Sequence, residues 1–341
     1  MSLFEARRLG EMSPVSKTIV YGLLGLWTLV VLFPLYWVLI TSFKLPGQVA
    51  DGPDYLPFVD FAPSLHAWRY IFVDLGADTF RPYWNSVVIA SISTVLAMAV
   101  GSCAAYALAR LHFRPRLLSV GLFLAALGLV IWALAATAVP WPIALSAGVA
   151  IFVVAVFALR RAPSPRLGNG DILFWVISQR ILPPVVAALP IYIMFQQLGL
   201  LDTRTAIVLT YTTVNMPIVV WLMYDFFVSI PKDLEESAEL DGASKLRIFV
   251  EIVLPLARPG LAATSLLVLI LSWNEYLLAL FLSTADAQTI PLLVAAQNAT
   301  RGPQWWYMSV LIVIMILPVI ALTLLLQRFI AKGLLLGAVK G

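Results

Sequence analysis

The chain has 341 residues, of which 61% are hydrophobic and only 12% are charged, and its formal net charge is +4. A soluble domain of this length needs far more charge to cover its surface, so the composition predicts a polytopic membrane protein. A small excess of Lys and Arg is typical of cytoplasmic loops in such proteins and does not indicate nucleic-acid binding. The single cysteine, Cys103, excludes an internal disulfide and a set of thiols for a metal.

Eight apolar stretches are long enough to cross a bilayer as helices, which takes about 20 residues each. Helix is the default in lipid because an open sheet edge leaves backbone groups without partners, and these stretches lack the alternation of barrel strands. We therefore expect an all-α fold. The predicted spans are 18–41, 84–109, 117–138, 143–159, 172–195, 206–228, 260–282 and 306–326.

The Lys and Arg residues are distributed unevenly over the connections between these spans. With the N-terminus inside, 16 fall in inside segments and five in outside segments. The positive-inside rule then predicts that both termini are cytoplasmic. The charged segment 1–17 is followed by no small-residue cleavage pattern, so we expect an uncleaved first span.

The segment 42–83 is the only long external connection in this topology. It carries five aspartates and several aromatic residues, and it is too short for a catalytic domain. Two alternatives remain open, a small cap or docking surface and an amphipathic loop that lies on the membrane.

The segment 231–258 is a polar island with ten charges among 28 residues. Pro231 and the acidic residues after it favour the start of a short helix over 231–241, and Gly242 supplies the left-handed position that ends it. We expect Leu234, Ala238 and Asp241 on one face of this helix and Glu235 and Glu239 on another.

A second helix is predicted directly after this glycine. Ser244 is placed to cap it, and Pro255 is placed to end it. Four apolar residues recur at helical spacing on one expected face: Leu246, Phe249, Val250 and Val253. The alternative is an ordinary interfacial loop.

The polar island also resembles a known motif. Glu236-Ser237-Ala238 and Asp241-Gly242-Ala243, followed by Phe249, Ile252 and Leu254-Pro255, are similar to the cytoplasmic coupling loop of permease subunits of ATP-driven importers. The resemblance is specifically to the maltose-transporter type of inner-membrane subunit. It extends to 85–116, 189–203, the WNEY sequence at 273–276 and the ending 327–341, in the family's order.

This resemblance implies a six-helix type I ABC importer permease core in the bacterial cytoplasmic (inner) membrane. It implies no cofactor in this chain, because ATP and Mg belong to two partner ATPase subunits. The other implied partners are a second, homologous permease subunit, an extracytoplasmic solute-binding protein, and a sugar or polyol substrate. Surrounding lipid is expected, and nucleic acid is not.

The residues carried over to the coupling loop are Glu236, Ser237, Ala238, Asp241, Gly242, Ala243 and Pro255. The resemblance implies that the helix formed by Glu236, Ala238, Asp241, Gly242 and Ala243 sits in a cleft of the ATPase subunit. Ser237 departs from the alanine that is usual in the family, and its hydroxyl adds one possible hydrogen bond to the partner.

Residues 117–170 have no counterpart in the six-span core that the resemblance implies. They form two predicted spans without an ionisable residue between 117 and 159, and they return the chain to the same side of the membrane. We expect a peripheral, lipid-facing hairpin, with a contact for an extra partner as the alternative. The predicted divisions are therefore 1–17, 18–116, the inserted hairpin 117–170, and the core 171–341.

Four polar residues inside predicted spans are candidates for the substrate path. Tyr211 and Asn215 are one helical turn apart, and Asn274 and Glu275 fall in the seventh span, where a carboxylate is costly unless it faces water or a partner. The alternative is that this span ends early and that Glu275 lies at the outer interface. Arg180 is expected to reach the cytosolic side instead of binding substrate.

Enzymatic function is not expected. The chain has no GxxxxGK[ST] sequence, so ATP must be bound elsewhere, and no cluster of His or paired carboxylates suggests metal or hydrolytic chemistry. An ion-coupled secondary transporter is the competing interpretation, but it predicts an internal repeat that the two halves do not show. An intramembrane enzyme is a third.

Overall fold

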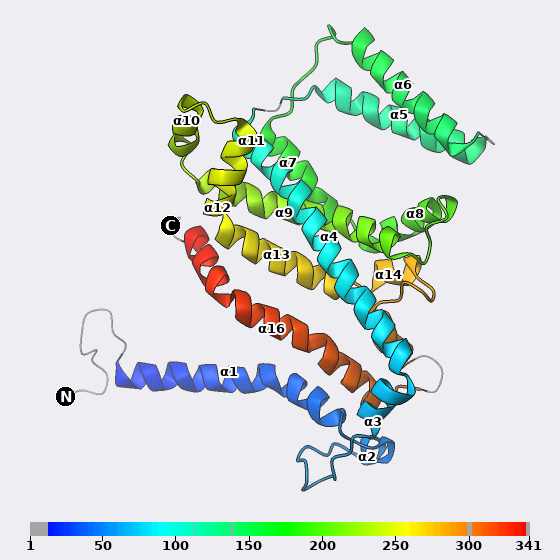
Figure 1. Cartoon of the computed structure of the whole chain (residues 1–341), viewed down its shortest axis with the longest axis vertical. Coiled ribbons are helices and arrows are strands. Elements are labelled where there is room, and N and C mark those ends of the chain that lie inside the picture. Colours follow the sequence, from blue (N-terminus) through cyan, green and yellow to red (C-terminus); the bar gives the residue numbers. More distant parts are fainter. Residues whose placement is uncertain (1–12, 113, 138, 299–301, 339–341) are drawn as a thin grey trace. The chain divides into compact units, whose positions relative to one another are not determined.

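The computed structural model describes residues 13–112, 114–137, 139–298 and 302–338, and these are almost entirely helical (Figure 1). They fall into two compact units. The first comprises the residues up to Ile92, Ala187–Val208 and Ile270–Gln327. The second comprises Ser93–Val186, Leu209–Leu269 and the residues from Arg328 onward.

The helices in chain order are α1 (Pro14–Thr41), α2 (Pro46–Asp51), α3 (His66–Arg69), α4 (Gly76–Arg110), α5 (Leu117–Ala136), α6 (Trp141–Ala158), α7 (Asn169–Ser178), α8 (Pro184–Gln197), α9 (Arg204–Ser229), α10 (Asp233–Leu240), α11 (Lys245–Ile248), α12 (Leu254–Leu256), α13 (Arg258–Trp273), α14 (Leu277–Leu282), α15 (Ile290–Ala296) and α16 (Trp305–Ala338). Short π-helical stretches follow α3 and α11, and a 3₁₀ turn, Gln179–Ile181, follows α7.

Among the described residues, six helices are long and apolar enough to cross a membrane: α1, α4, α5, α6, α9 and α16. The number rises to eight if each of two bent helix pairs forms one span. An all-helical membrane fold with six to eight spans is therefore confirmed.

The predicted span 172–195 is bent in the structure. Asn169–Ile181 and Pro184–Gln197 are bent by 89° relative to each other. The break lies at Leu182, Pro183 and Pro184, where two successive prolines remove backbone N–H donors and the residue before a proline is driven out of the helical region.

The expected span 260–282 also differs from the structure. α13 ends at Trp273, and α14 begins only at Leu277. The second bend, of 79°, separates Lys245–Leu256 from α13. Pro259 lies in the first turn of α13 and has no N–H to continue the helix from α12.

In the first unit, a hydrogen-bonded cluster organises the loops around α9's start. The Asp202 carboxylate accepts backbone N–H groups from Thr284, Ala285, Asp286 and Ala287 at 2.9–3.2 Å. The backbone of Asp202 itself adopts a positive φ of 56°. One carboxylate thus holds four successive residues of the α14–α15 connection.

In the second unit, α9 is the central helix. Its span is 61% buried, whereas those of α1 and α5 are 6% buried. Gly101 permits close packing of α4 on α9, because a Cβ there would lie 2.7 Å from Val219 Cγ1. The core that results consists of Ala97, Ala105, Val219, Val220, Met223, Phe227, Ile230, Ile248, Phe249, Val253, Ala257 and Val268.

The helices α5 and α6 pack on each other as a hairpin (Figure 1). A Cβ on Gly148 would lie 2.2 Å from Val130 Cγ2, so the glycine lets the two helices approach closely. At the base, Leu117 N donates to Pro165 O and Leu167 N donates to Pro115 O, both at 2.9 Å. Most other side chains of the pair are exposed, as a lipid-facing hairpin requires.

Candidate functional site

The polar island folds as two short helices joined by a sharp turn. α10 begins at Asp233 with three acidic residues in its first turn, where the helix dipole favours negative charge. It ends at Leu240, and Gly242 has a φ of +81°, the left-handed conformation predicted for it. Gly242 N donates to Glu239 O and Ala243 N donates to Ala238 O, both at 3.0 Å, which is the Schellman arrangement.

Ser244 caps the second helix as predicted. Its hydroxyl oxygen accepts the backbone N–H of Arg247 at 3.3 Å. The helix continues from α11 through the π-helical stretch Phe249–Val253 into α12, so Pro255 lies inside α12 and the bend to α13 follows it. The predicted end at Pro255 is therefore one residue early, because α12 ends at Leu256.

The apolar face expected on this second helix is partly wrong. Phe249 and Val253 are buried, but Leu246 and Val250 are 72% and 50% exposed, and Ile248 is buried in their place. Val250 lies within the π-helical stretch Phe249–Val253, where the α-helical spacing used for the expected face does not hold, whereas Leu246 precedes that stretch. Phe249 packs against Tyr106 of α4 and Phe227 of α9, with ring centroids 4.7 and 6.0 Å apart.

Glu235 is predicted to share a helix face with Glu239, and in the structure Glu235 is buried whereas Glu239 is exposed. Glu235 Oε1 accepts from Arg110 Nε at 2.5 Å, and its Oε2 accepts from the Tyr106 hydroxyl at 2.6 Å. The Arg110 and Glu235 side chains are 9% and 7% exposed. Arg110 Nη2 also donates to Ile230 O at 2.9 Å, so α10 is fixed to the end of α4 by a buried ion pair.

This ion pair is a feature that the sequence did not reveal. Four acidic side chains follow one another within seven residues of the island, and nothing in their spacing singles out Glu235. The distinguishing information is the position of Arg110, 125 residues away along the chain.

The outer side of the turn remains exposed. Glu236, Ser237, Asp241 and Gly242 are all exposed, and Leu240 is 90% exposed. Next to them lies a shallow cavity of about 220 Å³ lined by Ala238, Asp241, Ala243, Arg247, Ile248, Glu251 and Ile252. An exposed leucine beside a shallow hollow and several charges is a surface suited to contact with another protein.

The candidate path residues on α9 are both buried. Tyr211 and Asn215 lie on successive turns, and Asn215 Oδ1 accepts from Arg180 Nη2 at 2.7 Å. Arg180 is thus directed at α9 and not only toward the end of its own helix, which corrects the expectation that it merely reaches the cytosolic side.

The candidate residues at 274 and 275 lie between helices and not within a span. Asn274 Nδ2 donates to Ile270 O at 2.9 Å, and Glu275 Oε1 accepts from Leu278 N, in the first turn of α14, at 3.1 Å. The seventh helix therefore ends early, as the alternative interpretation had it, because α13 stops at Trp273.

The family model described as binding-protein-dependent transport system inner membrane component matches residues 117–335. The match begins at the first residue of α5, so the hairpin lies within its bounds, and the division into insert and core stays a prediction.

Two relatives align over nearly their full length. The probable ABC transporter permease protein y4oR of Sinorhizobium fredii is 30% identical over 323 residues, covering 92% of this chain and 95% of the relative. The trehalose/maltose transport system permease protein MalG of Thermococcus litoralis is 28% identical, covering 93% and 94%.

A solved structure shares the fold. It is the crystal structure of a bacterial ABC transporter involved in the import of the acidic polysaccharide alginate, with a TM-score of 0.60, 22% identity, and coverage of 96% of this chain and 100% of that one. Permease components of this kind are not enzymes and carry no cofactor, since ATP is hydrolysed on a separate subunit. The chain belongs to the inner-membrane permease family of binding-protein-dependent ABC transporters.

Proposed function

We propose that this chain is one of two homologous permease subunits of an importer for a sugar or polyol, of the maltose-transporter type. Its partners are two ATPase subunits and an extracytoplasmic solute-binding protein. The carbohydrate named for the Thermococcus relative supports this substrate class. The uneven distribution of Lys and Arg supports a topology with both termini in the cytoplasm.

The observation that carries the proposal is the geometry of 231–258. α10 presents Glu236, Ser237 and the Gly242 turn outward, while its inner side is fixed by Glu235. A short helix that is exposed on one side and held by a buried ion pair on the other can transmit the movement of a partner subunit to the helices behind it. When the ATPase subunits close on ATP, α10 moves as a unit, and the displacement passes to α4 through Arg110 and to α9 through Phe249.

The substrate path is proposed to include Tyr211, Asn215, Asn274 and Glu275. Hydroxyl, amide and carboxylate groups are the partners that hydroxylated solutes require. A cysteine at position 275 should react with a polar thiol reagent in one nucleotide state more than in another, and Glu275→Gln should change transport more than abundance. Absence of labelling in every state, with unchanged transport, would remove this residue from the path.

The experiment that tests the function is purification of the tagged chain from its native membrane. We expect an ATPase subunit and a second permease to copurify, and reconstituted complexes to hydrolyse ATP faster when the binding protein carries its sugar. Transport driven by an ion gradient without an ATPase would refute the proposal. A ligand screen on the binding protein then identifies the solute, because its pocket selects before the permease does.

A further inference from the structure

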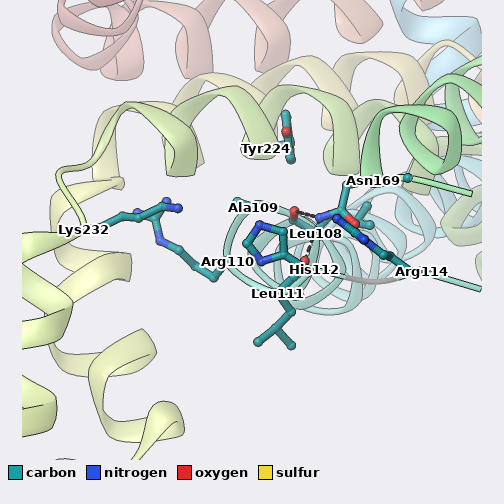
Figure 2. Close-up of a pocket in the computed structure, with 10 residues that line it drawn as sticks. Leu108, Ala109, Arg110, Leu111, His112, Arg114, Asn169, Tyr224 and Lys232 are labelled. Carbon is teal, nitrogen blue, oxygen red and sulfur yellow. Dashed lines mark hydrogen bonds between the residues drawn. The ribbon is translucent and has the colours of Figure 1, made fainter.

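A second cavity, of about 290 Å³, lies at the carboxyl end of α4, and it shares no lining residue with the 220 Å³ cavity beside α10 (Figure 2). Arg110, His112, Arg114 and Lys232 line it, together with Asn169 and Tyr224, and its lining contains no acidic side chain. Figure 2 shows Lys232 and Arg114 on opposite sides, with Arg110 and His112 between them. A cavity of this size whose charged lining residues are all basic favours an anionic occupant.

The cationic side chains around this cavity differ in whether an acidic side chain neutralises them. Arg110 is neutralised by Glu235, but Arg114 and Lys232 form no ion pair within the part of the chain that the structure describes. Free carbonyls at a helix C-terminus normally repel anions. Here Asn169 Nδ2 donates to the carbonyls of Leu108 and Leu111 at 2.7 and 2.6 Å, which reduces that repulsion.

We propose that this cavity binds a phosphate group, carried by the headgroup of an anionic phospholipid or by a soluble phosphate compound. The Arg114 guanidinium can offer two parallel N–H donors to phosphate oxygens, and Lys232 supplies a point charge. The His112 ring and the Tyr224 hydroxyl are further donors. Basic pockets between membrane helices, near the helix ends, are where lipid headgroups bind.

The position of this site connects it to the coupling loop. Lys232 immediately precedes α10, and Arg110, at the end of α4, both lines the cavity and holds Glu235. A bound phosphate would therefore join the start of α10 to the end of α4, the same two elements that the buried ion pair connects.

The test uses the purified permease with its ATPase partner in detergent. Native mass spectrometry measures binding of phosphatidylglycerol, of zwitterionic phosphatidylcholine and of inorganic phosphate. The double variant Arg114→Gln, Lys232→Gln removes the two uncompensated cations. The matched control, Arg160→Gln with Arg161→Gln, removes two cations from the turn after α6, which lies outside the cavity.

We expect phosphatidylglycerol affinity to fall about 25-fold in the double variant, roughly fivefold per cation, and to stay unchanged in the control. If inorganic phosphate shows this pattern and the lipid does not, the phosphate comes from a soluble compound. An equal fall in both double variants, or none in either, overturns the site. Should the double variant fail to fold, Arg114→Gln and Lys232→Gln singly must each show about a fivefold loss.

Discussion

Substitution of Gly242 by a residue with a side chain tests the role of the coupling loop. The left-handed backbone of Gly242 makes any β-branched replacement cost roughly 1 to 2 kcal/mol, and an added Cβ meets nothing within 4 Å of it in this chain. We predict that Gly242→Val inserts normally but loses the ATPase subunit or the substrate-stimulated hydrolysis of ATP. Reconstitution with the binding protein measures hydrolysis and uptake together.

The matched control for this variant is Gly199→Val. Gly199 also has a positive φ, of 66°, with open space around it, but it belongs to the connection between α8 and α9 and not to the coupling loop. The Gly199→Val variant should carry a similar backbone strain without loss of coupling. Wild-type hydrolysis and uptake in Gly242→Val would refute the role assigned to this loop.

Glu235 provides a second test at the scale of the residue. Removal of one partner of a buried ion pair leaves the other charge uncompensated and typically costs about 3 to 5 kcal/mol. Glu235→Gln should therefore lower the thermal midpoint of the purified chain, whereas Glu236→Gln, at the exposed neighbouring position, should leave it unchanged. The double variant Arg110→Leu, Glu235→Leu should recover most of the lost thermal midpoint, because neither charge is then buried alone. A Glu235→Gln protein as stable as wild type would show that the ion pair contributes nothing to stability.

Asp202 predicts a pH dependence of stability. Burial raises the pKa of its carboxyl, but the N–H donors of residues 284, 285 and 287 outweigh burial, so the pKa lies below its ordinary value. A depressed pKa stabilises the fold above the ordinary pKa, and this contribution is lost as the pH falls through the folded-state value.

Asp202→Asn should accordingly be less stable than wild type at pH 7, by about 1 to 2 kcal/mol, because a charged acceptor of several hydrogen bonds becomes neutral. The difference should shrink as the pH falls below about 4. Thermal midpoints measured across this range decide the matter. Asp51→Asn, at the exposed end of α2, serves as the control, and a constant difference at every pH would contradict the assignment.

At the scale of the element, the α5–α6 hairpin should be dispensable for coupling. Its contacts are largely internal, and Asn169, which binds the end of α4, follows it in sequence. We predict that deletion of 117–168 leaves membrane insertion, ATPase association and part of the transport intact. Pull-down and uptake assays measure this, and normal insertion without the ATPase subunit would instead assign the hairpin a partner contact.

At the scale of the whole molecule, the topology is the property to test. With both termini in the cytoplasm, a green fluorescent protein fused after residue 341 should fluoresce, and alkaline phosphatase fused there should be inactive, because each folds on one side of the membrane only. A phosphatase inserted after residue 52, in the predicted external loop, should be active. The reverse pattern would invert the orientation that the charge distribution predicts.

The sequence by itself determined the class of fold, most spans and the coupling turn. These depend on local properties, namely apolar length, the glycine at 242 and the serine cap at 244, which neighbouring residues specify without help from distant ones. Local spacing did not predict the exposure of Leu246 and Val250, because the buried side of this helix is the one that packs against α4 and α9.

Only the tertiary structure decided which polar groups meet. Glu235 is set apart from its acidic neighbours by Arg110, and Asn215 is joined to Arg180, through contacts between residues far apart in the chain. The bends at Pro183 and before Pro259 likewise required the structure, because a proline is tolerated in membrane helices where neighbours satisfy the freed backbone groups. The length of an apolar span depends on consecutive residues, whereas the partner of a buried charge depends on how helices pack together.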